Sequence, residues 1–154
     1  MGAVSTVPAF LTALRTRLAT ATSVSVYSAP VDAVLMGEAS VVLATENVTV
    51  EYDYETMPRT QVHETYSVDG FIWARENGTV PETVIAAART TAYALLEKVH
   101  DSIAALVGKT ATQAALGVDH VKVTGHSLEQ FASDDGRHVF LRFTIEADAY
   151  FDPS

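Results

Sequence analysis

The sequence contains no cysteine among its 154 residues. Disulfide scaffolds, thiol catalysis and cysteine-based zinc sites are therefore excluded. Basic residues are also few: 10 lysines and arginines stand against 19 aspartates and glutamates, for a formal net charge of −9. Proteins that neutralise nucleic-acid phosphates usually carry a basic patch, so this balance disfavours that class.

Long apolar runs and targeting signals are missing as well. The N-terminal stretch MGAVSTVPAFLTALRTRL has no basic segment ahead of its apolar residues, and Arg15 and Arg17 interrupt them. This is not the pattern of a secretory signal, and no window holds enough uninterrupted apolar residues to span a bilayer. We expect a soluble protein that is made in a cytoplasm and has no membrane partner.

Familiar catalytic motifs are absent too. The sequence has no GxSxG, P-loop, GxGxxG or HExxH pattern. The segments Asn47-Val48-Thr49 and Asn77-Gly78-Thr79 match the glycosylation pattern, but without a secretory signal they carry no meaning. We therefore expect no catalytic residue and no cofactor.

The residues that are present indicate one globular domain spanning residues 1–154. Hydrophobic residues make up 48% of the chain, which argues against disorder. A chain of this length can bury a core without disulfides or metal. No internal repeat, linker or change of composition divides it.

Two segments have the periodicity of helices. Residues 5–21 place Phe10, Leu11, Leu14 and Leu18 on one stripe, with Ser5 or Thr6 as cap and Pro8 in the first turn. We expect Arg15 and Arg17 to face water. Residues 81–108 give the strongest helical signal, since Pro81 and Glu82 suit its first turn and Gly108 ends it. Its apolar stripe comprises Ile85, Ala88, Ala92, Leu95, Leu96, Val99, Ile103 and Leu106. Residues 109–117 are expected to form a loop, with or without a short turn of helix.

The remaining segments have the alternation of strands. A short strand is expected within residues 23–30, a buried one at 41–43, and one at 48–54 with an apolar and an acidic face. Residues 59–79 predict a long strand with a bulge or bend at Gly70, or alternatively a hairpin at Asp69-Gly70. At the C-terminal end two strands flank a turn formed by Asp134, Asp135 and Gly136. The last strand alternates strictly, with apolar residues at 139, 141, 143, 145, 147, 149 and 151 on one face. The predicted fold is α+β: a mainly antiparallel sheet with two helices, one of them long, packed on one face.

Histidines offer little prospect of a metal site. His120 and His126 are six residues apart on one predicted strand, so they share a face but lie about 20 Å apart at ~3.4 Å per residue. His63 and His138 belong to other strands. We expect no bound metal and ordinary surface or half-buried histidines.

Carboxylates lie on several strands, often two residues apart. Paired carboxylates can serve acid–base catalysis, but acids that alternate along a strand more often form a solvated face. The functional alternative is electrostatic: Glu51, Asp53 and Glu64 would form an acidic wall past which DNA slides without binding. The strand aromatics Phe71, Trp73, Phe140 and Tyr150 are better explained by core or subunit packing than by ligand stacking.

Several segments together resemble a known family. These are the N-terminal VSTVPAFLTALRTRL helix, the VSVYSAPV turn, GFIWARENGT leading into the long RTTAYALLEKVHDSIAAL helix, and the closing hairpin LEQFASDDGRHVFLRFTIEADAYF. In this order they are similar to the tail terminator (tail-completion) proteins of long-tailed actinobacterial phages. The resemblance spans nearly the whole chain and is one of arrangement, because none of these segments is a catalytic signature.

The resemblance implies a structural protein of the virion, located at the head–tail junction. Six copies would form a ring that caps the tail tube, ends its growth and offers a surface to head-completion proteins, while DNA passes through the lumen without specific binding. The implied partners are further copies of the chain, the major tail tube protein and the neck proteins. Contacts are expected from the loops at 29–39, 54–60 and 133–137, in particular from Pro30, Met57, Pro58, Asp134, Asp135 and Arg137.

Two other interpretations stay open. The chain could be another neck component, such as a head-closure protein. It could also be a small α+β enzyme or ligand-binding domain with a pocket between the long helix and the sheet. The purely aliphatic helix stripe and the outward alternation of strand polar residues disfavour such a pocket.

Overall fold

The chain folds into one curved sheet with helices on one side. The structure is a computed structural model that describes residues 5–28, 39–45, 48–54, 62–78, 80–133 and 136–151. In chain order the elements are α1 (Val7–Thr22), β1 (Val26–Tyr27), β2 (Ala39–Ala44), β3 (Val50–Tyr54), β4 (Val62–Glu76), α3 (Pro81–Ala104), α4 (Lys109–Leu116), β5 (His120–Ser133) and β6 (Gly136–Phe151). None of these helices is both long and apolar enough to cross a membrane.

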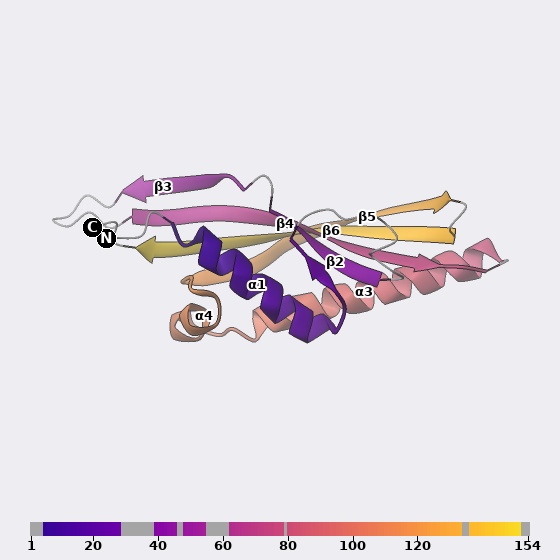
Figure 1. Ribbon diagram of the computed structural model, residues 1–154, viewed down its shortest axis with the longest axis horizontal. Coiled ribbons are helices and arrows are strands. Elements are labelled where there is room, and N and C mark those ends of the chain that lie inside the picture. Colours follow the sequence, from indigo (N-terminus) through magenta and orange to yellow (C-terminus); the bar gives the residue numbers. More distant parts are fainter. Residues whose placement is uncertain are drawn as a thin grey trace.

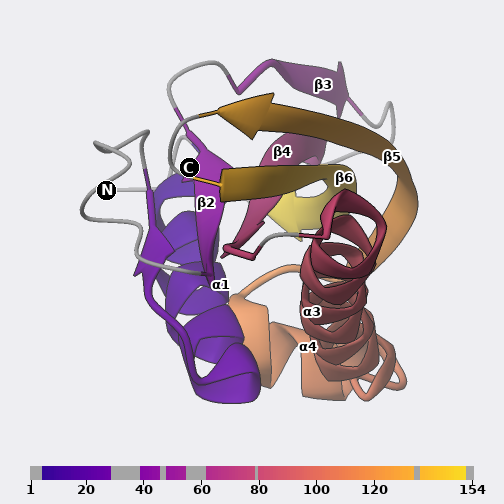
Figure 2. The ribbon, with the colours of Figure 1, turned by 90° about the vertical axis from the view of Figure 1, so that its right-hand side faces the viewer.

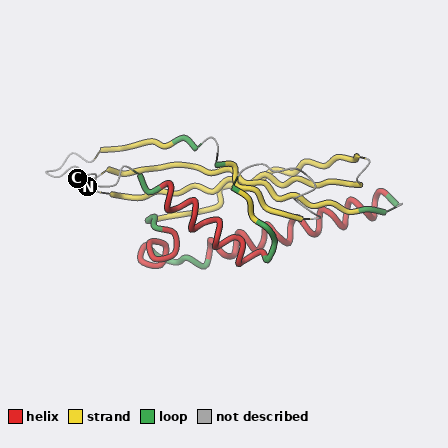
Figure 3. Tube along the Cα trace, viewed as in Figure 1, coloured by secondary structure: helices red, strands yellow, loops and turns green. Residues whose placement is uncertain are grey.

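The sheet has six strands in the order β1-β2-β4-β6-β5, with β3 also paired to β4. Every pairing is antiparallel except the short parallel contact of β1 with β2. Figure 1 and Figure 3 show the three described helices gathered on one side of the strands, and Figure 2 shows the strands curving over them. The predicted α+β class and the mainly antiparallel sheet are confirmed.

Strands β2 and β3 occupy the same edge of β4, one after the other. Ala44, at the end of β2, pairs with Asp69, and Val50, at the start of β3, pairs with Tyr66. The chain therefore advances six residues from one pair to the next, while β4 advances only three. The extra residues fall between the two strands. The long strand β4 therefore carries β2 along one half and β3 along the other, as the figure shows (Figure 1).

Alternation along the strands creates two faces. The inner face packs on the helices, and its side chains on β4 and β6 are almost fully buried: Tyr66, Val68, Ile72, Val139, Leu141, Phe143, Ile145 and Ala149. We call the opposite side of the sheet the outer face; its residues are the odd-numbered ones of β4 and the even-numbered ones of β6. Burial of a large apolar side chain stabilises a fold by about 1.5–3 kcal/mol, so the inner face supplies most of the core.

The first helix forms largely where its apolar stripe predicts. Phe10, Leu14 and Leu18 are fully buried against the sheet, with Pro8 in the first turn. One expectation is wrong: Arg17 is only half exposed, because its Nε and Nη2 atoms donate to the carbonyl oxygen of Ser102 at 2.9 and 2.7 Å. This contact joins the C-terminal end of α3 to α1.

The long helix α3 covers the inner face, as predicted, and is buried along its apolar stripe. Val84 is more deeply buried than Ile85 at the start of the stripe. The helix ends at Ala104, short of Gly108. The loop expected at 109–117 is instead α4, an eight-residue helix between Gly108 and Gly117, which both have positive φ. It forms because Thr112 and Leu116, one turn apart, are both buried.

Gly70 lies within one long strand, as the first of the two alternatives predicted, but the register there has no bulge and the hairpin alternative is wrong. Strand β4 runs straight through it, since Gly70 pairs with Leu43 on one side and Phe143 on the other. A Cβ atom there would lie 2.7 and 2.8 Å from Cε2 and Cε1 of the Phe143 ring, and closer still to Cζ. Glycine is required because the ring occupies the space of a side chain.

Candidate functional site: the outer face of the sheet

The polar side chains of the sheet gather on its outer face. Around residues 62–66 of β4, this face is flanked by β3 on one side and by β6 and the start of β5 on the other. Carboxylates outnumber fixed positive charges on it. The acids are Glu51, Asp53, Asp69, Glu129, Glu146 and Asp148, and the bases are Arg75, Lys122 and Arg142. The outer face is thus an acidic surface on the side of the sheet away from the helices.

Asp148 of β6 is the centre of a cluster that crosses three strands. Its Oδ1 lies 2.8 Å from Nδ1 of His120 on β5, and its Oδ2 lies 3.8 Å from Nε2 of His63 on β4. The His63 ring stacks on Tyr150, with 4.3 Å between ring centres. Among the residues that the structure describes, no group of three or more histidine, aspartate or glutamate side chains is arranged to hold a metal ion. The cluster joins neighbouring strands.

The two histidines of β5 lie on opposite faces, so the prediction that they share one is wrong. The pairing of β5 with β6 shifts between Val123 and Gly125, where one residue is inserted. A one-residue insertion reverses the alternation beyond it. His120 therefore lies on the outer face beside Asp148, whereas His126 lies near α3, with its Nε2 3.3 Å from the Tyr93 hydroxyl.

Glu51 and Asp53 lie together on the outer face, exposed to solvent, where they pair with Thr65 and His63 of β4. Glu64 does not join them. It lies on the inner face and is fully buried. The expected acidic trio is therefore two exposed residues on one face and one buried residue on the other.

The buried carboxylate of Glu64 holds the start of α1. Its Oε2 accepts from the Ser5 hydroxyl at 2.6 Å, and its Oε1 accepts from the Thr6 hydroxyl and from the Thr6 backbone N–H at 2.9 Å. The hydroxyl of Ser5 in turn accepts from the Val7 N–H at 3.0 Å. A carboxylate at a helix N-terminus satisfies free N–H groups and interacts favourably with the helix dipole. Glu64 is therefore a structural acid.

Tyr66 completes this buried group. Its hydroxyl lies 3.1 Å from the Thr6 hydroxyl oxygen. Burial raises the pKa of Tyr66 above its usual range; the hydrogen bond with Thr6 opposes this, and the charge of Glu64 adds to it. The alternation of β4 could have revealed this group from sequence, because residue 64 shares its parity with Val62, Tyr66 and Val68.

The outer-face aromatics pack within the chain. Trp73 is 5% exposed, and its ring lies 4.5 Å from Phe140 and 4.7 Å from His138, measured between ring centres. The guanidinium of Arg142 lies 5.0 Å from the centre of the Phe71 ring. For Trp73, packing within the chain agrees with the sequence interpretation, which favoured core or subunit packing over ligand stacking.

The expected contact residues are largely outside the described part of the chain: Pro30, Met57, Pro58, Asp134 and Asp135 all fall there. Arg137 is described. It is half-buried near the start of β6, where it pairs with Glu76 and Ala132.

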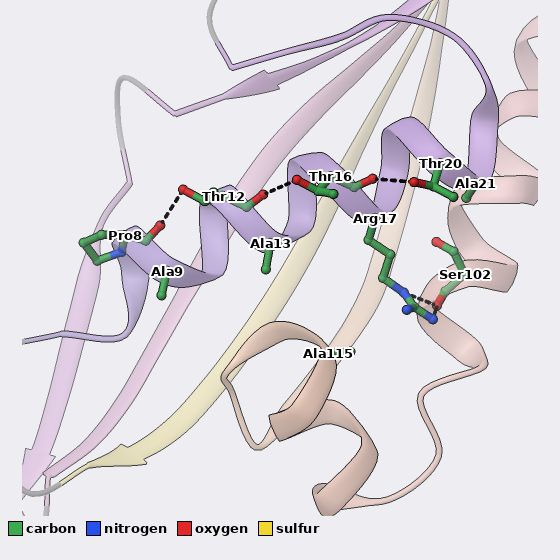
Figure 4. Close-up of a pocket in the computed structure, with 10 residues that line it drawn as sticks. All are labelled: Pro8, Ala9, Thr12, Ala13, Thr16, Arg17, Thr20, Ala21, Ser102 and Ala115. Carbon is green, nitrogen blue, oxygen red and sulfur yellow. Dashed lines mark hydrogen bonds between the residues drawn. The ribbon is translucent and has the colours of Figure 1, made fainter.

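A cavity of about 980 Å³ lies along the helices (Figure 4), and a smaller one of about 490 Å³ lies between the long helix α3 and strand β5. Thr12, Thr16 and Thr20 line the larger cavity on α1, but each hydroxyl donates to the carbonyl oxygen four residues earlier. Arg17 is engaged with Ser102. The polar groups of this cavity are bonded within the chain and do not converge on a common point as a catalytic site requires. Its lining is Pro8, Ala9, Thr12, Ala13, Thr16, Arg17, Thr20, Ala21, Ser102 and Ala115.

The fold has counterparts among solved structures, although no family model and no curated protein matches the sequence. One counterpart is a chain of the "Virion of native gene transfer agent (GTA) particle". It aligns with a TM-score of 0.53 and 14% sequence identity, over 96% of this chain and 100% of that chain. The two chains share a fold from end to end.

Proposed function

We propose that this chain is a structural virion protein of a phage-like particle, and specifically a tail terminator. Six copies would form a ring that caps the finished tail tube and offers its other rim to the head-completion proteins. The observation that carries the proposal is the fold match, which includes all of a virion chain and nearly all of this one. The resemblance of the helix, turn and hairpin segments to tail terminators points in the same direction.

The outer face supports a role in conducting DNA. It is rich in carboxylates and lies opposite the helices, so it can form the inner wall of a ring whose outside is helical. A wall of negative charge repels phosphates and lets DNA pass without binding. Glu51 and Asp53 belong to this wall; Glu64 does not, because it is buried on the inner face.

A non-enzymatic role fits the polar groups of the chain. The buried acid Glu64 is bound to the start of α1, and Asp119 accepts from the Gln113 side chain and the Tyr150 backbone N–H. These are structural hydrogen bonds. The cavity along α1 is lined mainly by alanines and by threonines whose hydroxyls are bonded within the helix.

Removal of the gene from a particle-producing strain tests the proposal. If the chain ends tail growth, particles made without it should have tubes of uncontrolled length, visible by negative-stain electron microscopy. Tubes of normal length that fail to join heads would instead identify a head-closure protein. Normal, infectious or DNA-transferring particles would refute both. Light scattering after size-exclusion chromatography, with and without tail tubes, tests the ring itself.

A further inference from the structure

Apart from the two-residue β1, which pairs only with β2, two strands have an edge with no strand partner among the described residues. The sheet ends at β5 on one side, and on the other side β3 has only β4 as neighbour. Unpaired strand edges present rows of N–H and C=O groups that readily pair with another chain. Both edges lie at the same end of the sheet, because β3 pairs with the start of β4 and β5 begins opposite the end of β6.

The outer faces of these two edges have complementary charges. Lys122 is exposed on β5, and Glu51 and Asp53 are exposed on β3. Within the described residues the ion pairs are those of Asp148 with His63 and His120, so these three charges have no ionic partner. Opposite charges on directly opposed strand positions stabilise pairing, whereas like charges there oppose it.

The inner sides of the two edges are apolar. On β5, Val121 and Val123 are half-buried and pack on the core. On β3, Val50 is half-buried and Tyr52 is 45% exposed. A strand that continued the sheet would keep inner residues beside inner residues, so it would extend this apolar layer and cover Tyr52. A hollow lined by Tyr93, Leu96 and Val123 opens between α3 and this part of β5.

Strand direction determines how two copies can join. Strand β3 is antiparallel to β4, β4 is antiparallel to β6, and β6 is antiparallel to β5. After these three reversals, β3 and β5 point in opposite directions within one copy. Copies related by a ring axis keep the same orientation along that axis. The β5 edge of one copy therefore meets the β3 edge of the next antiparallel, and the contact repeats until the ring closes.

We propose that β5 of one copy pairs antiparallel with β3 of the next, so that Lys122 lies opposite Glu51 and diagonal to Asp53. In this register Val121 faces Tyr52 and Val123 faces Val50. The inference rests on the proposed function, since it specifies how the subunits of the ring contact one another. It makes the acidic outer faces of neighbouring copies continuous.

The absence of cysteine allows a clean crosslinking test. A chain carrying both Glu51→Cys and Lys122→Cys is expressed in place of the wild type, and the assembled particles are oxidised. Directly opposed strand residues have Cα atoms about 4.5–5.5 Å apart, within the range of a disulfide. On a non-reducing gel we expect a ladder of linked oligomers that ends at the ring size. Each single variant alone should give no linked species, and an equal mixture of the two should give dimers and nothing larger.

A matched double variant, Asp53→Cys with Glu129→Cys, places both thiols on the outer face but Glu129 far along β5. It should not crosslink. If the Glu51/Lys122 variant is present in particles yet stays unlinked, the proposed contact is wrong while the proposed function stands. If the wild-type chain itself is absent from particles, the proposed function is wrong. Linkage by Lys122→Cys alone would show a β5–β5 contact and overturn the inference.

A charge exchange gives a second measurement. Lys122→Glu should weaken self-association by about tenfold, because like charges then face each other across the contact. Adding Glu51→Lys to that variant should restore self-association to the wild-type strength. If the exchange fails to restore association while both variants unfold at the wild-type temperature, the pairing is refuted.

Discussion

The backbone N–H of Thr6 donates to Oε1 of Glu64 across 2.9 Å, and through this bond a strand carboxylate holds the start of the first helix. The Thr6 hydroxyl donates to the same oxygen and the Ser5 hydroxyl to the other. One buried acid near the start of β4 thus holds the N-terminal end of α1.

Replacement of Glu64 by alanine should destabilise the fold by about 3 kcal/mol, because several buried donors lose a charged acceptor. Glu64→Gln should cost less, since its amide oxygen still accepts. The exposed acid Glu51 is the matched control, and Glu51→Gln should change stability by no more than about 0.5 kcal/mol. Chemical denaturation of the purified variants measures the difference. Equal effects at the two positions would contradict the structural role of Glu64.

Stability should fall in alkali because of Tyr66. Burial raises the pKa of its hydroxyl, so the folded chain holds this proton more tightly than the unfolded chain does. The stability that this proton contributes is fully present below the ordinary tyrosine pKa of about 10. It is lost as the pH rises above that value, by up to about 1.4 kcal/mol per pH unit. Tyr66→Phe lacks this proton, so its unfolding free energy should fall less steeply above pH ~10. Parallel curves for wild type and variant would refute the assignment.

Gly70→Ala should destabilise the fold by about 1–3 kcal/mol through overpacking against the Phe143 ring. Combining it with Phe143→Leu, which removes the ring, should cost less than the sum of the two single changes. Gly125→Ala is the control, because no atom lies within 4 Å of a Cβ placed there. Thermal unfolding of the four variants tests this, and strict additivity would show that the ring is not the obstacle.

The acidic outer face predicts an effect on DNA release. Asp69→Asn with Glu146→Gln removes two charges from the central strands β4 and β6, away from the β3 and β5 edges. We expect normal particle assembly but DNA release about tenfold slower at low salt, with a smaller difference at high salt. The control removes two exposed acids of α3 on the helical side, Glu82→Gln with Glu97→Gln. Wild-type release from the first variant would show that this face does not line the channel.

Much of the fold could be predicted from local pattern. The stripe of α3 and the alternation of β6 are each determined by residues close in sequence, and each lies where expected. Helix α4 could not be predicted as easily. Most of its eight residues favour helix, but a helix this short is unstable alone, and burial of Thr112 and Leu116 by other elements stabilises it.

The site was harder to predict because it depends on which face each residue occupies. Glu64 looks like Glu51 and Asp53 when strand acids are considered together, yet pairing places it on the buried side. Gly125 marks the residue inserted after Val123, since an isolated glycine within a strand pattern suggests a bulge. The insertion moves His126 from the outer face to the inner one.

The sequence by itself determined the class of fold, the two main helices, the closing hairpin and the acidic character of the strands, because periodicity and charge are local properties of the chain. Strand alternation could place Glu64 on the apolar side of its own strand, but only the tertiary structure decided which acids of different strands share a surface. The reason is physical: strand register assigns each side chain to a face. A carboxylate placed on the inner face must be hydrogen-bonded within the protein, whereas one on the outer face stays solvated and charged. Glu64 and Glu51 differ for that reason alone.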